Sequence, residues 1–213
     1  SLPAKSGALF GAPITITSNV DFPRDIIAAD LDNDGLMDLC SASKNKIACY
    51  PNTADNGFAF GTENIVCTKH KEVRRLATGD LDGDGYPDLA LASYKDNTIA
   101  WYRNTGKLGT QFSKEEIVVD SDCHAAISVV VADFDNDGHL DLAAASAGDN
   151  YVAWYRNTGD GKGTFTKRRY IIDPISYPIS IVTGDFNGDG WLDLAAGSYI
   201  DDQWNWKENK GKN

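Results

Sequence analysis

The sequence predicts an all-β protein, a β-propeller of four four-stranded antiparallel blades. A nine-residue acidic segment occurs four times, beginning at Asp30, Asp80, Asp133 and Asp185. Each copy lies among short β-branched or aromatic runs that Gly, Asn, Asp and Pro separate, which is typical of strands and turns. No segment shows an apolar period of 3.6 residues, so we expect no helices. Four antiparallel strands in a unit of about 40–50 residues is the size of a propeller blade.

The expected strands follow in chain order. An N-terminal strand is expected at Pro13–Thr17, before the first repeat. The four repeats then supply strands at 26–29, 39–43, 46–50 and 64–68; at 75–79, 89–93, 98–103 and 116–119; at 129–132, 142–146, 151–156 and 169–172; and at 181–184, 194–198 and 203–207. We treat 1–213 as a single repeat domain, with repeats at about 23–72, 73–125, 126–177 and 178–213, the last joined by 1–22.

The order of strand types predicts how the propeller closes. First strands carry small residues that suit a crowded axis, and third strands carry the bulky aromatics expected to pack between blades, such as Trp101 and Trp154. The chain opens on a strand of the fourth type and closes after one of the third type. We therefore expect the N-terminal strand to complete the last blade, since a sheet protein must protect its edges. The alternative is an open four-blade arc of a larger propeller, completed by another chain or by a longer one.

The acidic segments have the composition of calcium loops between two strands. Each has oxygen-bearing side chains at positions 1, 3, 5 and 9, and Gly at position 6. Calcium takes about 6–8 oxygen ligands, and Gly at position 6 permits the sharp turn. Position 7 can supply its backbone carbonyl, which explains the varied residues Leu36, Tyr86, His139 and Trp191 there. The bidentate Glu at position 12 of an EF-hand is missing, and the flanks are β-like.

The net charge of −11 is mostly ligand charge. The four loops hold fifteen of the 31 acidic residues, and four bound calcium ions would leave a net charge of about −3. A nucleic-acid partner, which needs a basic face, is disfavoured. No run of about 18 apolar residues exists, so we expect no membrane span.

The cysteines suggest one disulfide and a compartment. Cys40 and Cys49 flank a turn at Lys44-Asn45, and a two-residue turn would place them directly opposite each other. We hypothesise a disulfide there, with Cys67–Cys123 as a second pair; the alternative is four buried thiols. Calcium loops and a disulfide both favour an extracellular or lumenal setting, that of a secreted protein. No signal peptide is present at the start of this chain, which is compatible with a processed chain or an excised fragment.

Several segments of the chain resemble those of a known repeat family. The four loops, the Phe10-Gly11-Ala12-Pro13 run and the AWYRNTG runs within 93–106 and 147–159 carry the resemblance. The chain resembles the FG-GAP (VCBS-type) repeat family, the seven-bladed propeller of integrin α-subunits and of many secreted adhesion or enzyme-associated proteins. The resemblance covers nearly the whole chain. It departs from the family in having four repeats where seven are usual.

The resemblance implies four calcium sites. Asn187 replaces a carboxylate in the fourth, which should weaken that site. The implied ligands are Asp30, Asp32, Asp34 and Asp38; Asp80, Asp82, Asp84 and Asp88; Asp133, Asp135, Asp137 and Asp141; and Asp185, Asn187, Asp189 and Asp193, with the backbone oxygens of Leu36, Tyr86, His139 and Trp191.

The rim opposite the calcium loops is the candidate ligand surface, because loops on a rigid scaffold often carry function. Its mixture of Tyr, His and Arg suits a carbohydrate or a protein partner, whereas an ordinary solvated rim is the alternative. The candidate ligand-binding residues are Tyr94, His70, Arg74, His124, Tyr177 and Tyr199.

We expect a non-catalytic binding, adhesion or assembly module rather than an enzyme. His70 and His124 occupy equivalent positions and, facing each other, could serve acid–base chemistry. However, the chain has only three His, shows no nucleophile–base spacing, and commits fifteen of its 31 acidic residues to calcium. The alternatives are a carbohydrate-binding lectin, a propeller polysaccharide lyase or hydrolase, and a structural subunit of an oligomer or larger assembly.

Overall fold

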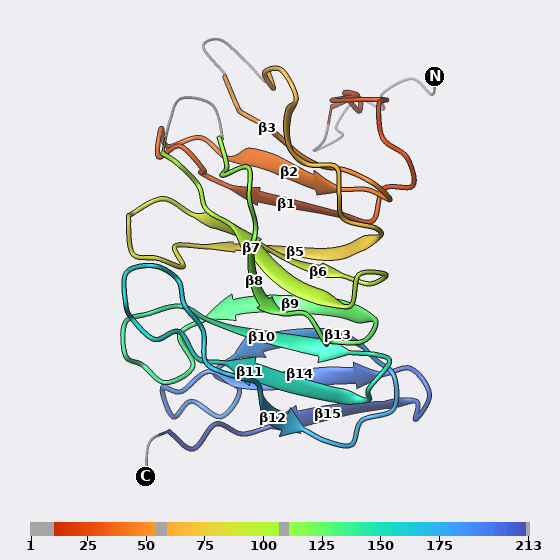
Figure 1. The fold of residues 1–213 in the computed structure, drawn as a ribbon, viewed down its shortest axis with the longest axis vertical. Helices are drawn as coiled ribbons and strands as arrows, with labels where there is room; N and C mark the ends of the chain where they lie inside the picture. The colour runs from red at the N-terminus through yellow and green to blue at the C-terminus, as the bar shows by residue number, and fades with distance from the viewer. Residues whose placement is uncertain (1–10, 54–58, 107–110, 212–213) are drawn as a thin grey trace.

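The computed structural model describes residues 11–53, 59–106 and 111–211. Their regular structure consists of fifteen β-strands in four antiparallel sheets, one sheet for each repeat (Figure 1). These ranges include no helix long and apolar enough to cross a bilayer. The all-β prediction, with blade-like sheets, is confirmed.

The observed strands lie within a few residues of the expected ones. The first sheet contains β1 (Asp25–Ala29), β2 (Asp38–Ala42), β3 (Ile47–Tyr50) and β4 (Asn64–Cys67). The second contains β5 (Val73–Gly79), β6 (Asp88–Ser93), β7 (Thr98–Tyr102) and β8 (Ile117–Asp120). The third contains β9 (Ala126–Ala132), β10 (Asp141–Ser146), β11 (Tyr151–Tyr155) and β12 (Arg169–Ile172). The fourth contains β13 (Pro178–Gly184), β14 (Asp193–Ser198) and β15 (Gln203–Lys207).

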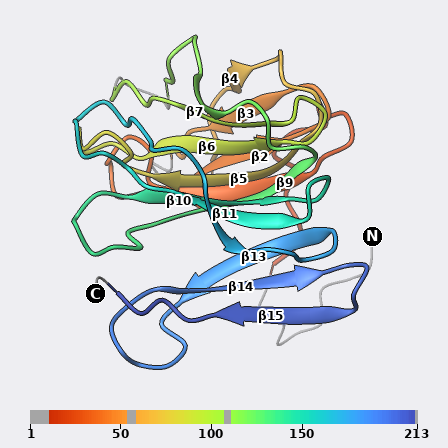
Figure 2. The same ribbon diagram turned by 60° about the horizontal axis from the view of Figure 1, so that its bottom comes forward.

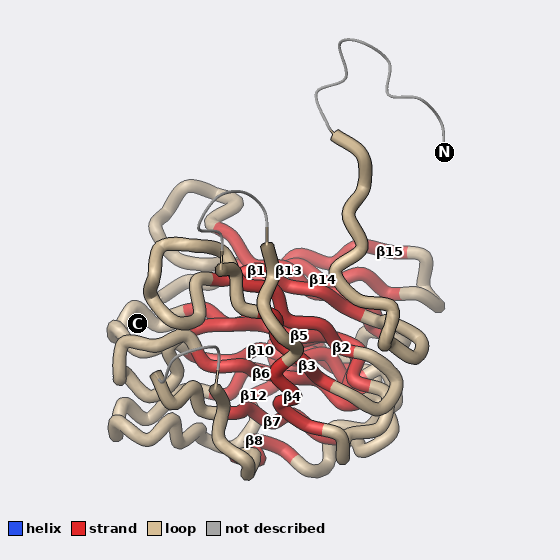
Figure 3. Tube along the Cα trace, turned by 90° about the horizontal axis from the view of Figure 1, so that it is seen from above, coloured by secondary structure: helices blue, strands red, loops and turns tan. Residues whose placement is uncertain are grey.

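The sheets stack in chain order through their first strands. Strand β5 contacts β1 and β9, and β9 contacts β13. Figure 2 shows the fourth sheet as a separate layer beside the third. Seen from above, the strands occupy the middle of the molecule and the loops gather at their two ends (Figure 3). One end carries the acidic loops between first and second strands, and the other carries the turns between second and third strands.

Three hydrophobic cores fill the spaces between neighbouring sheets. Tyr102 belongs to the core between the first and second sheets, and Trp101 and Tyr155 belong to the core between the second and third. These three rings are almost fully buried, as expected for the third-strand aromatics. Every residue of β6 and β10 is buried, and their many Ala residues leave room for the rings.

The register between second and third strands confirms the predicted disulfide. Cys40 lies opposite Cys49 and the two form a disulfide bond. The second proposed pair is wrong. Cys67 and Cys123 are free and buried, because Cys67 packs between the first and second sheets and Cys123 between the second and third.

The expected closure by an N-terminal strand is also wrong. Residues 13–17 form no strand, and the fourth sheet has three strands. The segment before β1 lies on the first sheet instead, where it lines a groove with Ile26 and Tyr50. Hydrogen bonds hold it there: Lys46 Nζ donates to the carbonyl of Asn19 at 2.6 Å, and the amide of Lys44 donates to the carbonyl of Asp21 at 2.9 Å. The described residues therefore form the alternative arrangement, an open arc of blades.

Candidate functional site

Each acidic loop is a turn that its own first carboxylate organises. The loops join the first and second strands of each sheet. In the first loop, Asp30 Oδ1 accepts the amide of Asp34 at 3.0 Å and Oδ2 accepts the amide of Gly35 at 2.9 Å. Gly35 has a φ of 88°, a left-handed conformation in which Gly carries no steric penalty. The same bonds recur in the other loops, so position 6 requires Gly for the reason the sequence predicted.

The aspartate at position 9 ties the loop to the outer part of its sheet. Asp88 is fully buried; it accepts the amides of Leu81 at 2.9 Å and Asn104 at 2.7 Å. Asp38, Asp141 and Asp193 make the equivalent pairs of bonds. The position 9 carboxylate therefore stabilises the fold by accepting two backbone amides, in addition to being one of the acidic groups of the loop.

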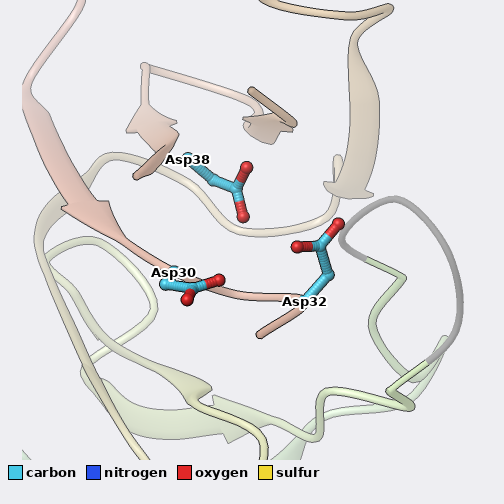
Figure 4. Close-up of side chains that lie close together, drawn as sticks. All are labelled: Asp30, Asp32 and Asp38. Atoms are coloured by element: carbon cyan, nitrogen blue, oxygen red, sulfur yellow. The ribbon is translucent and has the colours of Figure 1, made fainter. Parts of the chain in front are cut away.

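Three of the four loops bring carboxylates together in a group that could hold a metal ion. Each group offers one oxygen from positions 1, 3 and 9, and these oxygens lie within 4.8 Å of one another. Figure 4 shows the first group, with Asp30, Asp32 and Asp38 around a common space. The groups are Asp30, Asp32 and Asp38; Asp80, Asp82 and Asp88; and Asp133, Asp135 and Asp141.

The pKa shifts show that these carboxylates are poorly solvated. Burial raises the pKa of Asp88 to about 7 and that of Asp141 to about 6. Burial, followed by the charges of neighbouring loop carboxylates, raises the pKa of Asp32. A bound cation would favour the ionised forms and offset both causes. The donor set, made of carboxylate oxygens in a tight turn, fits a hard cation such as calcium.

Position 5 and the fourth loop differ from the expectation. The position 5 carboxylates lie outside the three groups, and in each loop their Oδ1 accepts the amide of position 7, at 2.8 Å for Asp34 and Leu36. The fourth loop forms no group of three carboxylates in the described part of the chain. Its Asn187 donates through Nδ2 to Asp189 Oδ2 at 3.0 Å and to Glu208 Oε1 at 3.3 Å.

Two arginines that the sequence analysis did not select bind loop carboxylates. Arg103 Nη1 lies 2.7 Å from Asp82 Oδ2 in the second loop. In the third loop, Arg156 donates through Nε to Asp135 Oδ2 at 2.5 Å and through Nη2 to Asp137 Oδ2. Both arginines follow the third strand of their sheet in a Trp-Tyr-Arg-Asn-Thr-Gly run. That repeated run was the available signal, but it does not specify the partner.

The same run explains how neighbouring sheets are joined beside the loops. Asn104 Nδ2 donates to the carbonyl of Leu31 in the acidic loop of the preceding repeat at 2.7 Å and to the carbonyl of Pro87 at 3.0 Å. Asn157 and Asn209 make the equivalent bonds. The Gly of the run has a left-handed φ and lies under the position 7 side chain, so a Cβ there would clash with the ring. These pairs are Gly106 under Tyr86, Gly159 under His139 and Gly211 under Trp191.

A groove of about 730 Å³ lies between the outer parts of the third and fourth sheets, beside the third loop. Trp154 and Tyr170 line it from the third sheet, and Trp191 lines it from the fourth loop. In the second sheet, Trp101 occupies the position equivalent to Trp154 and is fully buried. Its ring packs closely against Gly163, where an added Cβ would lie 2.4 Å from the ring. Charged side chains complete the lining: Asp135, Arg156, Arg169, Lys207, Glu208 and Lys210.

On the opposite rim, four of the six candidate ligand residues come together. The Arg74 guanidinium lies 4.8 Å from the centre of the Tyr94 ring. The hydroxyls of Tyr94 and Tyr177 are 2.9 Å apart, and the rings of Tyr177 and Tyr199 are 6.1 Å apart. Tyr199 is 67% exposed.

In the structure the two histidines each pair with acidic side chains. His70 is buried, with Nδ1 3.3 Å from Asp96 Oδ2 and Nε2 2.5 Å from Glu116 Oε2. His124 is half exposed and its Nδ1 lies 2.9 Å from Asp149 Oδ1. Each therefore pairs with the aspartate of a neighbouring turn, which also accepts a hydrogen bond from a serine hydroxyl of that turn.

Comparison with known proteins identifies the repeat. The model of the FG-GAP-like repeat matches at residues 30–91, 80–144 and 133–196, and thus covers most of the chain. The chain belongs to the FG-GAP repeat family. No curated protein matches the sequence.

Solved structures with a similar fold include a lectin and a bacterial toxin. A lectin of Agrocybe aegerita, described for specific recognition of non-reducing terminal N-acetylglucosamine, is 20% identical with a TM-score of 0.62 over 90% of this chain and 51% of that one. The Photorhabdus luminescens Tc holotoxin pore is 21% identical with a TM-score of 0.51, over 85% of this chain and 9% of that one. The FG-GAP chain therefore spans about half the length of the lectin, and these likenesses describe its fold.

Proposed function

We propose that this FG-GAP chain is a non-catalytic, calcium-stabilised module that binds carbohydrate in the groove between its third and fourth sheets. The groove carries the proposal. Its volume is about 730 Å³, and Trp154, Tyr170 and Trp191 offer it aromatic surface. Arg169 and Glu208 add polar groups to its lining. Binding sites for small ligands are commonly clefts of about 300–1,000 Å³ that combine aromatic walls with a few polar groups.

Two further observations support this proposal and its setting. The fold is similar to that of a lectin described for recognition of N-acetylglucosamine. The Cys40–Cys49 disulfide favours an extracellular or lumenal location, where disulfides persist.

The metal in this proposal is calcium, and its role is structural. The first three loops offer three carboxylates each, and the family resemblance assigns calcium to such loops. We propose a fourth, weaker site in the loop where Asn187 replaces a carboxylate. When bound, the ion would neutralise carboxylates that otherwise repel one another beside each inner hairpin.

A catalytic role is not proposed. His70 lies buried between Asp96 and Glu116, which leaves neither ring nitrogen facing an open cleft. Incubation with a panel of polysaccharides should therefore produce no new reducing ends or unsaturated products. Turnover that His70→Ala or His124→Ala abolishes would establish the enzymatic alternative instead.

The binding test uses a matched pair of exposed aromatic residues. Tyr170 lines the groove and is 57% exposed, whereas Trp204 is 84% exposed and is not a lining residue of the groove. A glycan array followed by calorimetry on the best ligand should show binding by the parent protein and by Trp204→Ala. Tyr170→Ala should weaken it at least about tenfold, the loss expected for one aromatic contact. Equal affinity of all three proteins would remove the groove as the site.

The opposite rim is a second candidate site. There the chain, as an adhesion or assembly module, would bind a carbohydrate or a protein partner. Its support is the cluster of Arg74, Tyr94, Tyr177 and Tyr199. Tyr199→Ala separates the two sites. Binding that is lost in this variant and kept in Tyr170→Ala would place the partner on the rim.

A further inference from the structure

Arg156 is shared by the third acidic loop and the groove. Its guanidinium binds Asp135 Oδ2 at 2.5 Å and Asp137 Oδ2, and it also lines the groove. The side chain is 32% exposed, whereas those of Asp135 and Asp137 are 9% and 16% exposed. The positive charge of Arg156 therefore partly neutralises two largely buried carboxylates, those of Asp135 and Asp137, at the wall of the groove.

This pairing conflicts with a bound metal ion. Asp135 is one of the three carboxylates that could hold the ion in the third loop. A divalent cation there would compete with the guanidinium for Asp135 and would repel its positive charge at short range. Arg156 keeps its charge at any ordinary pH. When a cation binds Asp135, the guanidinium must therefore either move away or lower the affinity of the loop for the cation.

The four repeats show that the loop itself does not require the arginine. Arg103 pairs with Asp82 in the second loop but does not line the groove. The equivalent position is Pro51 in the first repeat and Glu208 in the fourth. Among the described arginines, Arg156 is therefore the one that pairs with a loop carboxylate and also lines the groove.

We propose that Arg156 couples calcium in the third loop to an acidic saccharide in the groove, an inference that rests on the proposed function. Without calcium, Asp135 and Asp137 hold the guanidinium. With Asp135 bound to calcium, the Nε donor of Arg156 is released while Asp137 still accepts from Nη2, and the guanidinium turns its freed donors to the groove, where its planar fork matches a carboxylate of the ligand.

The charged residues that line the groove indicate which class of saccharide it favours. Its cations are Arg156, Arg169, Lys207 and Lys210, and its acids are Asp135 and Glu208. Once Asp135 is neutralised by calcium, four cations face one carboxylate. The calcium form therefore favours a saccharide that carries carboxylates over a neutral one of the same size.

The first experiment measures the metal side without any saccharide. Calcium is titrated while NMR follows the backbone amide of Gly138, which reports on the third loop alone. Arg156→Gln removes the competing charge and should tighten binding at this loop by roughly fivefold, the upper end for a partly exposed ion pair. Arg169→Gln is the matched control, because Arg169 lies over the Trp154 ring and also lines the groove. Unchanged or weaker binding in Arg156→Gln would overturn the competition.

The second experiment measures the groove side with two matched saccharides. Hyaluronan tetrasaccharide carries glucuronate carboxylates, and chitotetraose is neutral; both contain N-acetylglucosamine. Calcium should tighten hyaluronan tetrasaccharide binding to the parent protein several-fold, leave chitotetraose unchanged, and have no such effect in Arg156→Gln. Linkage requires the acidic saccharide to tighten calcium binding at Gly138 by the same factor.

The outcomes separate the two proposals. If both saccharides bind equally with and without calcium, the coupling is wrong and the proposed function stands. If neither saccharide binds in any state, the groove half of the coupling falls, and the glycan array with Tyr170→Ala decides the carbohydrate function separately. The Gly138 titration then still decides whether Arg156 competes with calcium.

Discussion

At the residue scale, each loop aspartate has its own task. Position 1 builds the turn, and position 9 is buried and joins two backbone amides from different segments. Only positions 1, 3 and 9 converge as a possible metal site in the first three loops. The buried carboxylates therefore contribute to the fold even without an ion.

Asp88→Asn tests this structural role. An amide offers one acceptor oxygen where Asp88 accepts two backbone amides, so one buried N–H of Leu81 or Asn104 would lose its partner. In chelator, we expect the free energy of unfolding to fall by about 2 kcal/mol in urea titrations. Asp84→Asn, at an exposed position, is the control and should change it by less than about 0.5 kcal/mol. Equal effects of the two variants would contradict the assignment.

The raised pKa values predict an unusual pH dependence for the metal-free protein. Burial raises the pKa of Asp88 to about 7 and that of Asp141 to about 6, above the values in an unfolded chain. Between about pH 4 and 7 the native state then binds more protons than the unfolded state, so stability falls as pH rises. In chelator the protein should melt at a higher temperature at pH 5 than at pH 7.5. In calcium this order should reverse, since the ion requires ionised ligands.

At the element scale, the third and fourth sheets differ in their outer strands. Strand β11 pairs with β10 and β12, and most of its residues are buried. Within the described ranges, strand β15 pairs with β14 alone and is largely exposed, with Trp206 at 54% where the equivalent Trp101 is fully buried. The fourth sheet thus keeps a well-buried second strand, β14, whereas its third strand, β15, is exposed.

Hydrogen exchange should resolve this difference. Amides of β15 lie at a sheet edge with few buried neighbours, so local opening there costs less free energy than in β11. We expect β15 amides to exchange at least about tenfold faster than β11 amides under native conditions. Strand β7 serves as the internal reference and should match β11. Equal protection of β11 and β15 would show that something covers the edge of the fourth sheet in solution.

At the scale of the whole molecule, the sheets depend on contacts that run along the arc beside the acidic loops. One Asn in each of the second, third and fourth repeats donates to a backbone carbonyl in the acidic loop of the preceding repeat: Asn104 to Leu31, Asn157 to Leu81 and Asn209 to Phe134. Metal binding would therefore act on inter-sheet packing as well as on single hairpins.

Chelation is the test at this scale. A ligand that binds only the native state stabilises it by about 2.7 kcal/mol per site at a concentration of 100 Kd. With three occupied loops, removal of calcium should lower the melting temperature by at least about 10 °C. Differential scanning calorimetry with calcium, with chelator and with calcium restored would measure the change. A melting temperature that is the same with calcium and with chelator would contradict the proposed structural role of calcium.

Local patterns were sufficient to predict much of the fold. The pairing of Cys40 with Cys49 followed from turn length, because strand register depends on the turn that joins the strands. The loops followed from the spacing of Asp and Gly within nine residues. The partners of Arg103 and Arg156 did not follow, because those arginines and their carboxylates lie in different segments of the repeat.

The sequence by itself determined the four-fold repeat, the strands and the carboxylate-rich turns, since each depends on residues near one another in the chain. Only the tertiary structure decided that the N-terminal segment lies on the first sheet, that Arg156 faces both a loop and a groove, and that His70 is buried between two acids. These outcomes depend on hydrogen bonds, charges and packing between distant segments, which spacing along the chain does not encode.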